Sequence, residues 1–484
     1  MKKVLAVFLL LAMLLACLVG CKKGDGSTSD TTAMTTVEGE IIPLPEADYS
    51  GKSFTILARQ NYSYEWDYIP EEAGAAINDA IYQRNEAVKN RYGITLTMAY
   101  VSNANFEADF MNPLNNSIKA GDDTYQLAAG YEYRLAPNAT TGAFLNWYDV
   151  PYVDLNGEWW DKEFAEAVSY KDNAYIMTGS LSLSHLYSSS CFFFNQDLLD
   201  SIKSAGTSAA LFESVKGGSW TVEKFYELAN DCSSESGDGV WDTTDTYAFA
   251  SNTSTAIDGF LFAFDIPVSV RNNNGEIVLN PIGDKTVNAL KKINDFVNKE
   301  SQTFIQPTNG TEIDPFVGML KEGKAVFSTG RLADGQTLRA TEVNYGIIPY
   351  PKWDASQDNY YSFTLNYSTA FAIPTTVDQE LVGTVTEALA YFSHKYVRDA
   401  LYNTVLKYRD AKDQASSECI DIILSHTKYD FAYIYAYAWG DVAGPATLFR
   451  KYVEMNQNSI NVGFIKSEKS WNTTLEKFLQ NFNT

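Results

Sequence analysis

The chain has 484 residues, and 60 acidic against 37 basic side chains give it a formal net charge of −23. This charge argues against nucleic acid or an anionic membrane surface as a partner, because both are bound by clustered cations. A composition of 45% hydrophobic and 20% charged residues is typical of a folded protein, and the length predicts two or more domains. Aromatic residues make up 14% of the chain. Tyr and Trp combine a flat apolar face with a polar tip, which suits both cores and sugar-like ligands.

The first residues have the pattern of an export signal. Lys2 and Lys3 precede an apolar run over residues 4–18, which is short for a membrane-spanning helix. The run ends in Leu18-Val19-Gly20-Cys21, which resembles the lipobox of bacterial lipoproteins. That resemblance implies a cleaved signal over residues 1–20 and a lipid, such as palmitate, on Cys21. The alternatives are a plain signal peptide with an accidental Cys and a retained membrane helix.

Residues 21–46 are rich in small and acidic residues and are expected to form a flexible tether. Residues 53–58 then predict a strand, residues 75–92 a helix ended by Gly93, and residues 94–98 a second strand. Strand, helix and strand in this order predict a parallel pair with a right-handed crossover.

Alternating strands and helices continue along the chain. Residues 125–130 and 191–194 predict strands, and Asn195 and Thr221 each have the position and side chain of a helix N-cap. Further strands are predicted at residues 325–329 and 345–349. Apolar residues at helical spacing predict helices at 287–297, 385–405 and 471–482. The fold class expected from this alternation is α/β with a helical C-terminal part.

Catalytic and cofactor motifs are mostly missing from the sequence. The three His residues are His185, His394 and His426, and none belongs to a metalloprotease motif. Residues 318–325 imitate a phosphate loop, but Ala325 stands where a Ser or Thr must bind Mg²⁺, so Gly323 is interpreted as a helix end. Paired carboxylates for glycoside hydrolysis stay open, because 60 acids offer many pairs. We therefore expect no catalytic residues and no cofactor.

Two further features of the sequence concern metal binding and crosslinks. Residues 234–245 follow the spacing of a calcium loop, but Ser at its first and third positions favours an ordinary polar turn. Cys191, Cys232 and Cys419 remain after the signal, and we expect buried free thiols rather than zinc ligands, with one disulfide as the alternative.

Several segments resemble the extracellular solute-binding lipoproteins of bacterial ABC importers, of the carbohydrate type called family 1. The matching segments are the lipobox at Cys21 and residues 78–85, 193–199, 323–327 and 345–352, the last reading Tyr-Gly-Ile-Ile-Pro-Tyr-Pro-Lys. The resemblance implies a two-lobed, periplasmic-binding-protein-like fold with a ligand cleft between the lobes. It implies lobe 1 over residues 47–180 and 328–367, and lobe 2 over residues 181–327 and 368–484. Crossovers between the lobes are expected near residues 180–190, 328–331 and 367–371.

The same resemblance, together with the aromatic surplus, leads to candidate ligand-binding residues. They lie in loops after predicted strands and in the late aromatic segment 433–440, and they are Tyr62, Tyr64, Trp66, Tyr131, Tyr133, Arg331 and Trp439. Aromatic faces stack on sugar rings, and an Arg donates paired hydrogen bonds to hydroxyls or a carboxylate.

The function implied is that of a monomeric, non-enzymatic binding protein. It would capture a small-molecule ligand, an oligosaccharide first of all, and pass it to ABC permease subunits at the outer face of the bacterial cytoplasmic membrane. It would touch that membrane only through its lipid. A cationic solute or peptide is the nearest competing ligand. A surface-anchored glycan-active enzyme or glycan adhesin is the alternative function.

Overall fold

The computed structural model describes residues 43–60, 75–102, 104–202, 206–230, 232–299, 302–306, 317–365, 368–440 and 444–482. The chain divides into two units, Met1–Pro43 and Leu44–Thr484, and the fold below is that of the second unit. Cys21 and the expected signal and tether up to residue 42 lie outside the described residues. Among the described residues, no helix combines the length and the apolar character that crossing a membrane requires.

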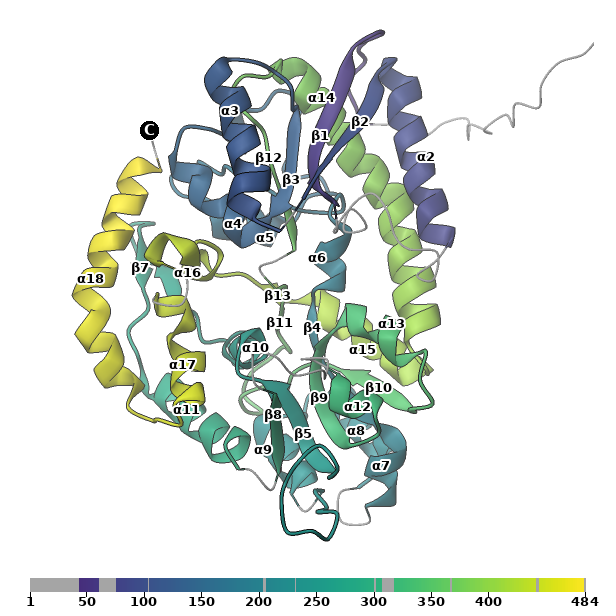
Figure 1. Cartoon of the computed structure of the whole chain (residues 1–484), viewed down its shortest axis with the longest axis vertical. Coiled ribbons are helices and arrows are strands. Elements are labelled where there is room, and N and C mark those ends of the chain that lie inside the picture. The colour runs from purple at the N-terminus through teal and green to yellow at the C-terminus, as the bar shows by residue number, and fades with distance from the viewer. Residues whose placement is uncertain are drawn as a thin grey trace, which may run out of the picture. The chain divides into compact units, whose positions relative to one another are not determined.

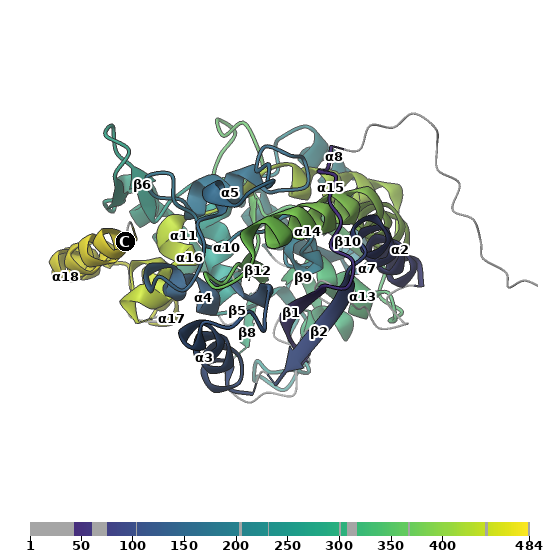
Figure 2. The same cartoon turned by 90° about the horizontal axis from the view of Figure 1, so that it is seen from above.

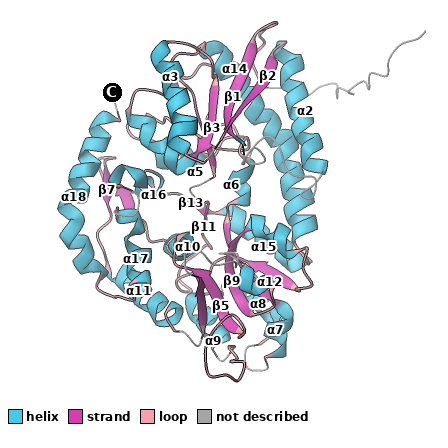
Figure 3. Cartoon of the chain, viewed as in Figure 1, coloured by secondary structure: helices cyan, strands magenta, loops and turns pink. Residues whose placement is uncertain are grey.

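Two mixed β-sheets organise the described chain (Figures 1 and 3). The first has the order β12-β3-β1-β2 and the second the order β10-β4-β9-β5-β8. We call the first sheet with its helices lobe 1 and the second sheet with its helices lobe 2. The larger strands are β1 (Ser53–Arg59), β2 (Thr95–Val101), β3 (Leu127–Tyr131), β4 (Ser190–Asn195), β5 (Tyr247–Asn252), β8 (Thr303–Gln306), β9 (Ala325–Arg331), β10 (Tyr345–Ile348) and β12 (Thr369–Ala372). Two short pairs join β6 (Ser269–Arg271) to β7 (Ile277–Leu279) and β11 (Ser362–Phe363) to β13 (Thr427–Lys428).

Helices cover both sheets. The α-helices of five or more residues are α2 (Ala75–Tyr92), α3 (Asn112–Ala120), α5 (Lys162–Val168), α6 (Leu183–Tyr187), α7 (Gln196–Ser201), α8 (Ser208–Lys216), α9 (Val222–Ala229), α10 (Thr255–Ala263), α11 (Asp284–Val297), α14 (Gln379–Phe392), α15 (Gln414–Ser425), α17 (Leu448–Glu454) and α18 (Ile460–Asn481). Shorter ones are α4 (Glu132–Leu135), α12 (Gly318–Lys321), α13 (Gly335–Leu338) and α16 (Phe431–Ile434). Seen from above, α3 lies on one side of the lobe 1 sheet and α14 and α2 on the other (Figure 2).

The expected β-α-β unit is confirmed at the start of lobe 1. Strands β1 and β2 pair in parallel, with Ser53 opposite Thr95, and β3 pairs in parallel on the other side of β1. Helix α2 ends where Gly93 takes a positive φ of 68°, a conformation that favours glycine. In lobe 2 the Asn195 and Thr221 side chains accept the backbone N–H groups of Leu198 and Lys224, so both predicted N-caps are confirmed.

The strand pairing differs from the expected lobe boundaries at two segments. Residues 368–484 were expected in lobe 2, but β12 at residues 369–372 belongs to the lobe 1 sheet. Residues 328–367 were expected in lobe 1, with a crossover near residues 328–331. In the structure β9 and β10 both pair with β4 in the lobe 2 sheet, and residues 328–331 form the last part of β9. The chain returns to the lobe 1 sheet only at β12, which pairs antiparallel with β3. Residues 180–190 lead from lobe 1 into β4, and residues 364–368 lead from β11 back to β12.

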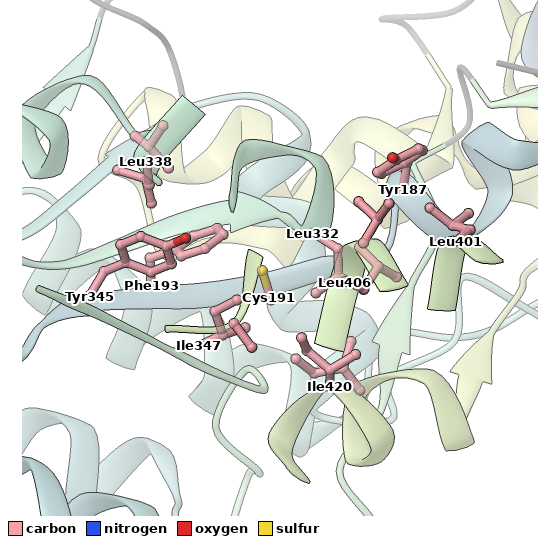
Figure 4. Packing of buried hydrophobic residues seen from close by; sticks show 14 of the residues in the cluster. Tyr187, Cys191, Phe193, Leu332, Leu338, Tyr345, Ile347, Leu401, Leu406 and Ile420 are labelled. Atoms are coloured by element: carbon pink, nitrogen blue, oxygen red, sulfur yellow. The ribbon is translucent and has the colours of Figure 1, made fainter. Parts of the chain in front are cut away.

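An apolar core joins elements that are far apart in the sequence (Figure 4). It contains Ile77 and Ile81 of α2, Cys191 and Phe193 of β4, and Ile420 of α15, all almost fully buried. Burying each large apolar side chain contributes roughly 1.5–3 kcal/mol. Cys191, Cys232 and Cys419 are buried free thiols, as expected.

The calcium-like loop uses its acids to bind its own backbone. One Glu235 oxygen accepts the N–H groups of Asp238 and Gly239, at 2.8 and 2.7 Å. The two Asp245 oxygens accept N–H groups of Ser236 and Asp242, each at 2.7 Å. These bonds make residues 234–245 a self-contained polar turn.

Candidate functional site

The carboxyl ends of β1 and β3 bring the first candidate residues together. Both strands are parallel, so Arg59 and Tyr131 stand at the same edge of the sheet, where open α/β folds bind ligands. The Arg59 guanidinium lies over the Tyr131 ring, 4.6 Å from its centroid. It also donates to the Thr369 hydroxyl at the start of β12, at 3.4 Å.

A second arginine extends this arrangement to the late aromatic segment. The Tyr133 ring packs edge-on against Tyr131, with centroids 4.7 Å apart. The Arg134 guanidinium lies 5.0 Å from the Tyr133 centroid and 4.5 Å from that of Tyr437. Tyr437 is 41% exposed. We call Arg59, Tyr131, Tyr133, Arg134 and Tyr437 the aromatic–arginine cluster.

A buried carboxyl group fixes the cluster to the second crossover. β3 passes directly into α4, so Glu132 points inward between the two cluster tyrosines and is only 3% exposed. Its backbone N–H donates to the Ser368 carbonyl at 3.0 Å, and its carboxyl oxygen accepts the Ser368 hydroxyl at 3.1 Å. Burial raises the pKa of Glu132 to about 8. The group therefore holds its proton at neutral pH and adds no negative charge beside the cluster.

Within the segment 433–440, the cluster receives Tyr437 rather than the expected Trp439. Both lie on the 3₁₀-helix η9 (Ala436–Trp439), where residues two apart point to different sides. Trp439 is only 8% exposed, and its indole N–H donates to the Trp471 carbonyl of α18 at 3.1 Å. Its ring packs in the C-terminal helices, and a ligand contact by Trp439 stays a prediction.

Arg331 ends β9 in lobe 2 and has a carboxylate partner. Its guanidinium makes two hydrogen bonds to Asp334, at 2.7 and 3.2 Å, and its backbone N–H donates to the same carboxylate at 2.7 Å. Asp334 is 4% exposed, so this pair holds the turn after β9. A ligand contact by Arg331 also stays a prediction.

Tyr62, Tyr64 and Trp66 lie outside the described residues. A ligand contact by any of these three stays a prediction. Sequence reasoning identified Tyr131 and Tyr133 but missed Arg59, Arg134 and Tyr437. The signal for Arg59 was its place at the end of a strand, and the signal for Arg134 was its neighbour Tyr133.

The side chains of the cluster are of types that suit contacts with a hydroxyl-rich molecule. Tyrosine faces stack against apolar sugar faces, and guanidinium and phenol groups donate hydrogen bonds to hydroxyls. Among the described residues, no three His, Cys, Asp or Glu side chains lie close enough together to hold a metal ion.

Comparison with solved structures shows where this fold occurs. The ABC substrate-binding protein Lmo0181 from Listeria monocytogenes, solved in complex with cycloalternan, is 10% identical over 89% of this chain and 98% of its own, with a TM-score of 0.51. A family 1 extracellular solute-binding protein from Bifidobacterium longum subsp. infantis is 13% identical over 89% and 99%, with a TM-score of 0.50. RafE from Streptococcus pneumoniae, solved in its apo form, is 13% identical over 90% and 98%, with a TM-score of 0.53.

This chain has the two-lobed α/β fold of those solute-binding proteins, and the fold expected from its sequence is confirmed. The comparison extends over nearly the whole length of each neighbour. No family model and no curated protein matches the sequence.

Proposed function

We propose that this protein captures an oligosaccharide between its two lobes and delivers it, chemically unchanged, to an ABC importer. The observation that carries the proposal is the aromatic–arginine cluster. It places three tyrosine rings and two guanidinium groups at the carboxyl ends of β1 and β3, and one of the rings is substantially exposed.

The ligand class follows from the chemistry of these groups. A hydroxyl-rich, uncharged molecule presents apolar ring faces to tyrosines and acceptor oxygens to guanidinium groups. The net charge of −23 adds no attraction for an anion at long range. The solved neighbours add support through the sugar that one of them holds, since Lmo0181 carries cycloalternan.

The membrane attachment in this proposal is a lipid on Cys21, with the folded chain outside the cell. Leu18-Val19-Gly20-Cys21 and the basic and apolar residues before it support this attachment. A cysteine that carries two acyl chains anchors a protein stably to a membrane without a membrane-spanning helix.

A panel of neutral oligosaccharides tests the proposal. Maltotetraose, raffinose and cellotetraose are added separately to the purified chain, and melting temperature and reducing ends are both measured. A binder shows a higher melting temperature, because ligand at about 100 times Kd adds roughly 2.7 kcal/mol to the folded state. Release of reducing ends would instead support a glycan-active enzyme. No shift with any neutral sugar, alongside a shift with cationic peptides, would overturn the ligand class.

A further inference from the structure

Three side chains from separate parts of the fold meet in a hydrogen-bonded triangle. The His185 Nε2 atom lies 2.8 Å from the Asp161 Oδ2 atom and 2.8 Å from the Tyr429 hydroxyl. The Tyr429 hydroxyl donates to the same Asp161 oxygen at 2.9 Å. We call Asp161, His185 and Tyr429 the clasp.

Each member of the clasp is fixed to a different structural part. Asp161 belongs to lobe 1, where its other carboxylate oxygen caps α5 by accepting the Phe164 N–H at 2.8 Å. His185 lies on α6, inside the first crossover. Tyr429 follows β13, which pairs with β11 on the lobe 2 side of the second crossover. The clasp therefore ties lobe 1, a crossover and the chain leaving lobe 2 to one another.

The Tyr429 ring adds apolar contacts to these hydrogen bonds. It stacks on the His185 ring, with centroids 5.9 Å apart and planes at 13°, and meets the Phe164 ring edge-on at 5.3 Å. The position of the hydroxyl is thus set by packing on both sides of the ring.

The clasp lies across the crossovers from the aromatic–arginine cluster. Beyond β12 the lobe 1 sheet is continued by single bridges from Phe371 to Met177 and from Gly179 to Trp160, the residue before Asp161. The crossovers leave from Gly179 and arrive at Thr369, whereas the cluster stands at the ends of β3 and β1. Figure 2 shows α5 and the pair β1–β2 on opposite sides of β12.

A cavity of about 340 Å³ borders the clasp. Asp161 and His185 line it together with Trp159, Arg398 and Thr427. Because the cavity has room for water, separated clasp atoms can be hydrated, and the net cost of separating them is the modest one of exchanging hydrogen bonds with water.

We propose that the clasp opposes closure of the lobes over the ligand. When two lobes turn about their crossovers and approach on one side, the contacts on the other side must separate. The clasp bonds are formed in the structure, and a closure that separates this side of the crossovers lengthens them. This inference rests on the proposed function only in assuming that ligand binding closes the lobes.

The test variant is Tyr429→Phe, which removes the hydroxyl that donates to Asp161 and keeps the ring. Losing one net hydrogen bond of ordinary strength is expected to shift the balance between open and closed forms about 2- to 10-fold toward closed. Asp161→Asn is the second variant, since Asn keeps the helix cap but replaces the shared acceptor by a donor. Tyr350→Phe is the matched control: its buried hydroxyl donates to the Ala256 carbonyl within lobe 2.

Closure is measured without ligand as the distance between two spin labels. The labels are placed at Lys162→Cys and Ser425→Cys, two exposed positions on either side of the clasp. Both clasp variants are expected to lengthen the mean label distance by double electron–electron resonance, and Tyr350→Phe to leave it unchanged. An unchanged or shorter distance in both folded clasp variants would overturn the inference. If wild-type protein binds none of the panel sugars, the proposed function fails, but this ligand-free distance still decides the role of the clasp.

With a panel sugar that wild-type protein binds, titration calorimetry provides the second measurement. Tighter binding by Tyr429→Phe, by the same 2- to 10-fold, is expected because less free energy opposes closure. Weaker binding by both clasp variants would contradict the proposed direction.

Discussion

Tyr437 and Trp439 show how one turn of backbone decides which aromatic side chain meets the candidate site. They are two residues apart on a 3₁₀-helix, and Gly440 ends that helix with a φ of 84°. Trp439 packs towards α18, while Tyr437 reaches Arg134. The sequence marks the segment as aromatic, but it does not show the helix type that separates the two rings.

The proposed site predicts a loss of affinity on truncating the cluster. Tyr437→Ala and Tyr133→Ala are each expected to weaken binding of a panel sugar about 3- to 10-fold, because each removes a stacking face worth roughly 0.5–1.5 kcal/mol. Titration calorimetry measures the change. Tyr82→Ala is the control, since Tyr82 is 65% exposed on α2 and outside the cluster. Equal affinity in wild type and both cluster variants would contradict the site.

Glu132 predicts a pH dependence of stability with a definite sign. Its pKa is about 8 in the folded chain because of burial, against an ordinary value of 4.5. The unfolded chain therefore releases this proton at lower pH than the folded chain does. Stability from this group is fully present below about pH 4.5 and is lost as pH rises towards 8. Burial raises the pKa of Glu387 and Asp410 to about 7, which acts in the same direction.

Urea unfolding at pH 5 and pH 8 measures this effect. Wild-type protein is expected to be less stable at pH 8, with Glu132 contributing on the order of 3 kcal/mol to the difference. Glu132→Gln keeps a polar side chain that does not titrate, so its stability should fall less between the two pH values. The exposed Glu380→Gln is the control. Parallel pH profiles for wild type and Glu132→Gln would refute the assignment.

Other residues were predicted well where their role depends on near neighbours. Asn195 and Thr221 bond to backbone groups three residues ahead, which a local pattern can reveal. The Trp439–Trp471 hydrogen bond and the clasp depend on partners from distant segments. A single sequence carries no signal of such pairings, so the cluster was only partly predicted and the clasp not at all.

At the scale of single elements, α9 depends on its first residue. The Thr221 hydroxyl accepts the Lys224 N–H at 3.3 Å, satisfying one of the donors that a helix start leaves open. Thr221→Ala is expected to lower the free energy of unfolding by about 1 kcal/mol. Urea denaturation with an unchanged m-value measures it. Thr221→Ser keeps the hydroxyl and should stay close to wild type, and equal losses in both variants would argue against a capping role.

Element types were predicted more reliably than element partners. Hydrophobic periodicity and turn residues identified β1, α2 and β2, and the pairing of the two strands follows from the order strand, helix, strand. The same signals identified β9 and β10 as strands but did not show that both pair with β4. An antiparallel partner more than 100 residues away leaves no trace in the local pattern.

At the scale of the whole molecule, the proposed lipid anchor predicts where the protein is found. In a bacterium that expresses the full chain, the protein should sediment with membranes and be accessible to added protease. Cys21→Ala is expected to release it from the membrane fraction, because the substitution removes the thiol that would carry the lipid. Cys232→Ala, which alters a buried thiol of the folded part, serves as the control. Membrane retention of Cys21→Ala would contradict the anchor.

The place of β12 in the lobe 1 sheet has a consequence for how the chain folds during synthesis. The five strands of the lobe 2 sheet lie between residues 190 and 348. In lobe 1, β3 pairs with β12, which begins only at residue 369. As the chain emerges from its N-terminus, the second sheet can be completed while the first still has an open edge. During this interval the unpaired edge of β3 can pair with a wrong strand.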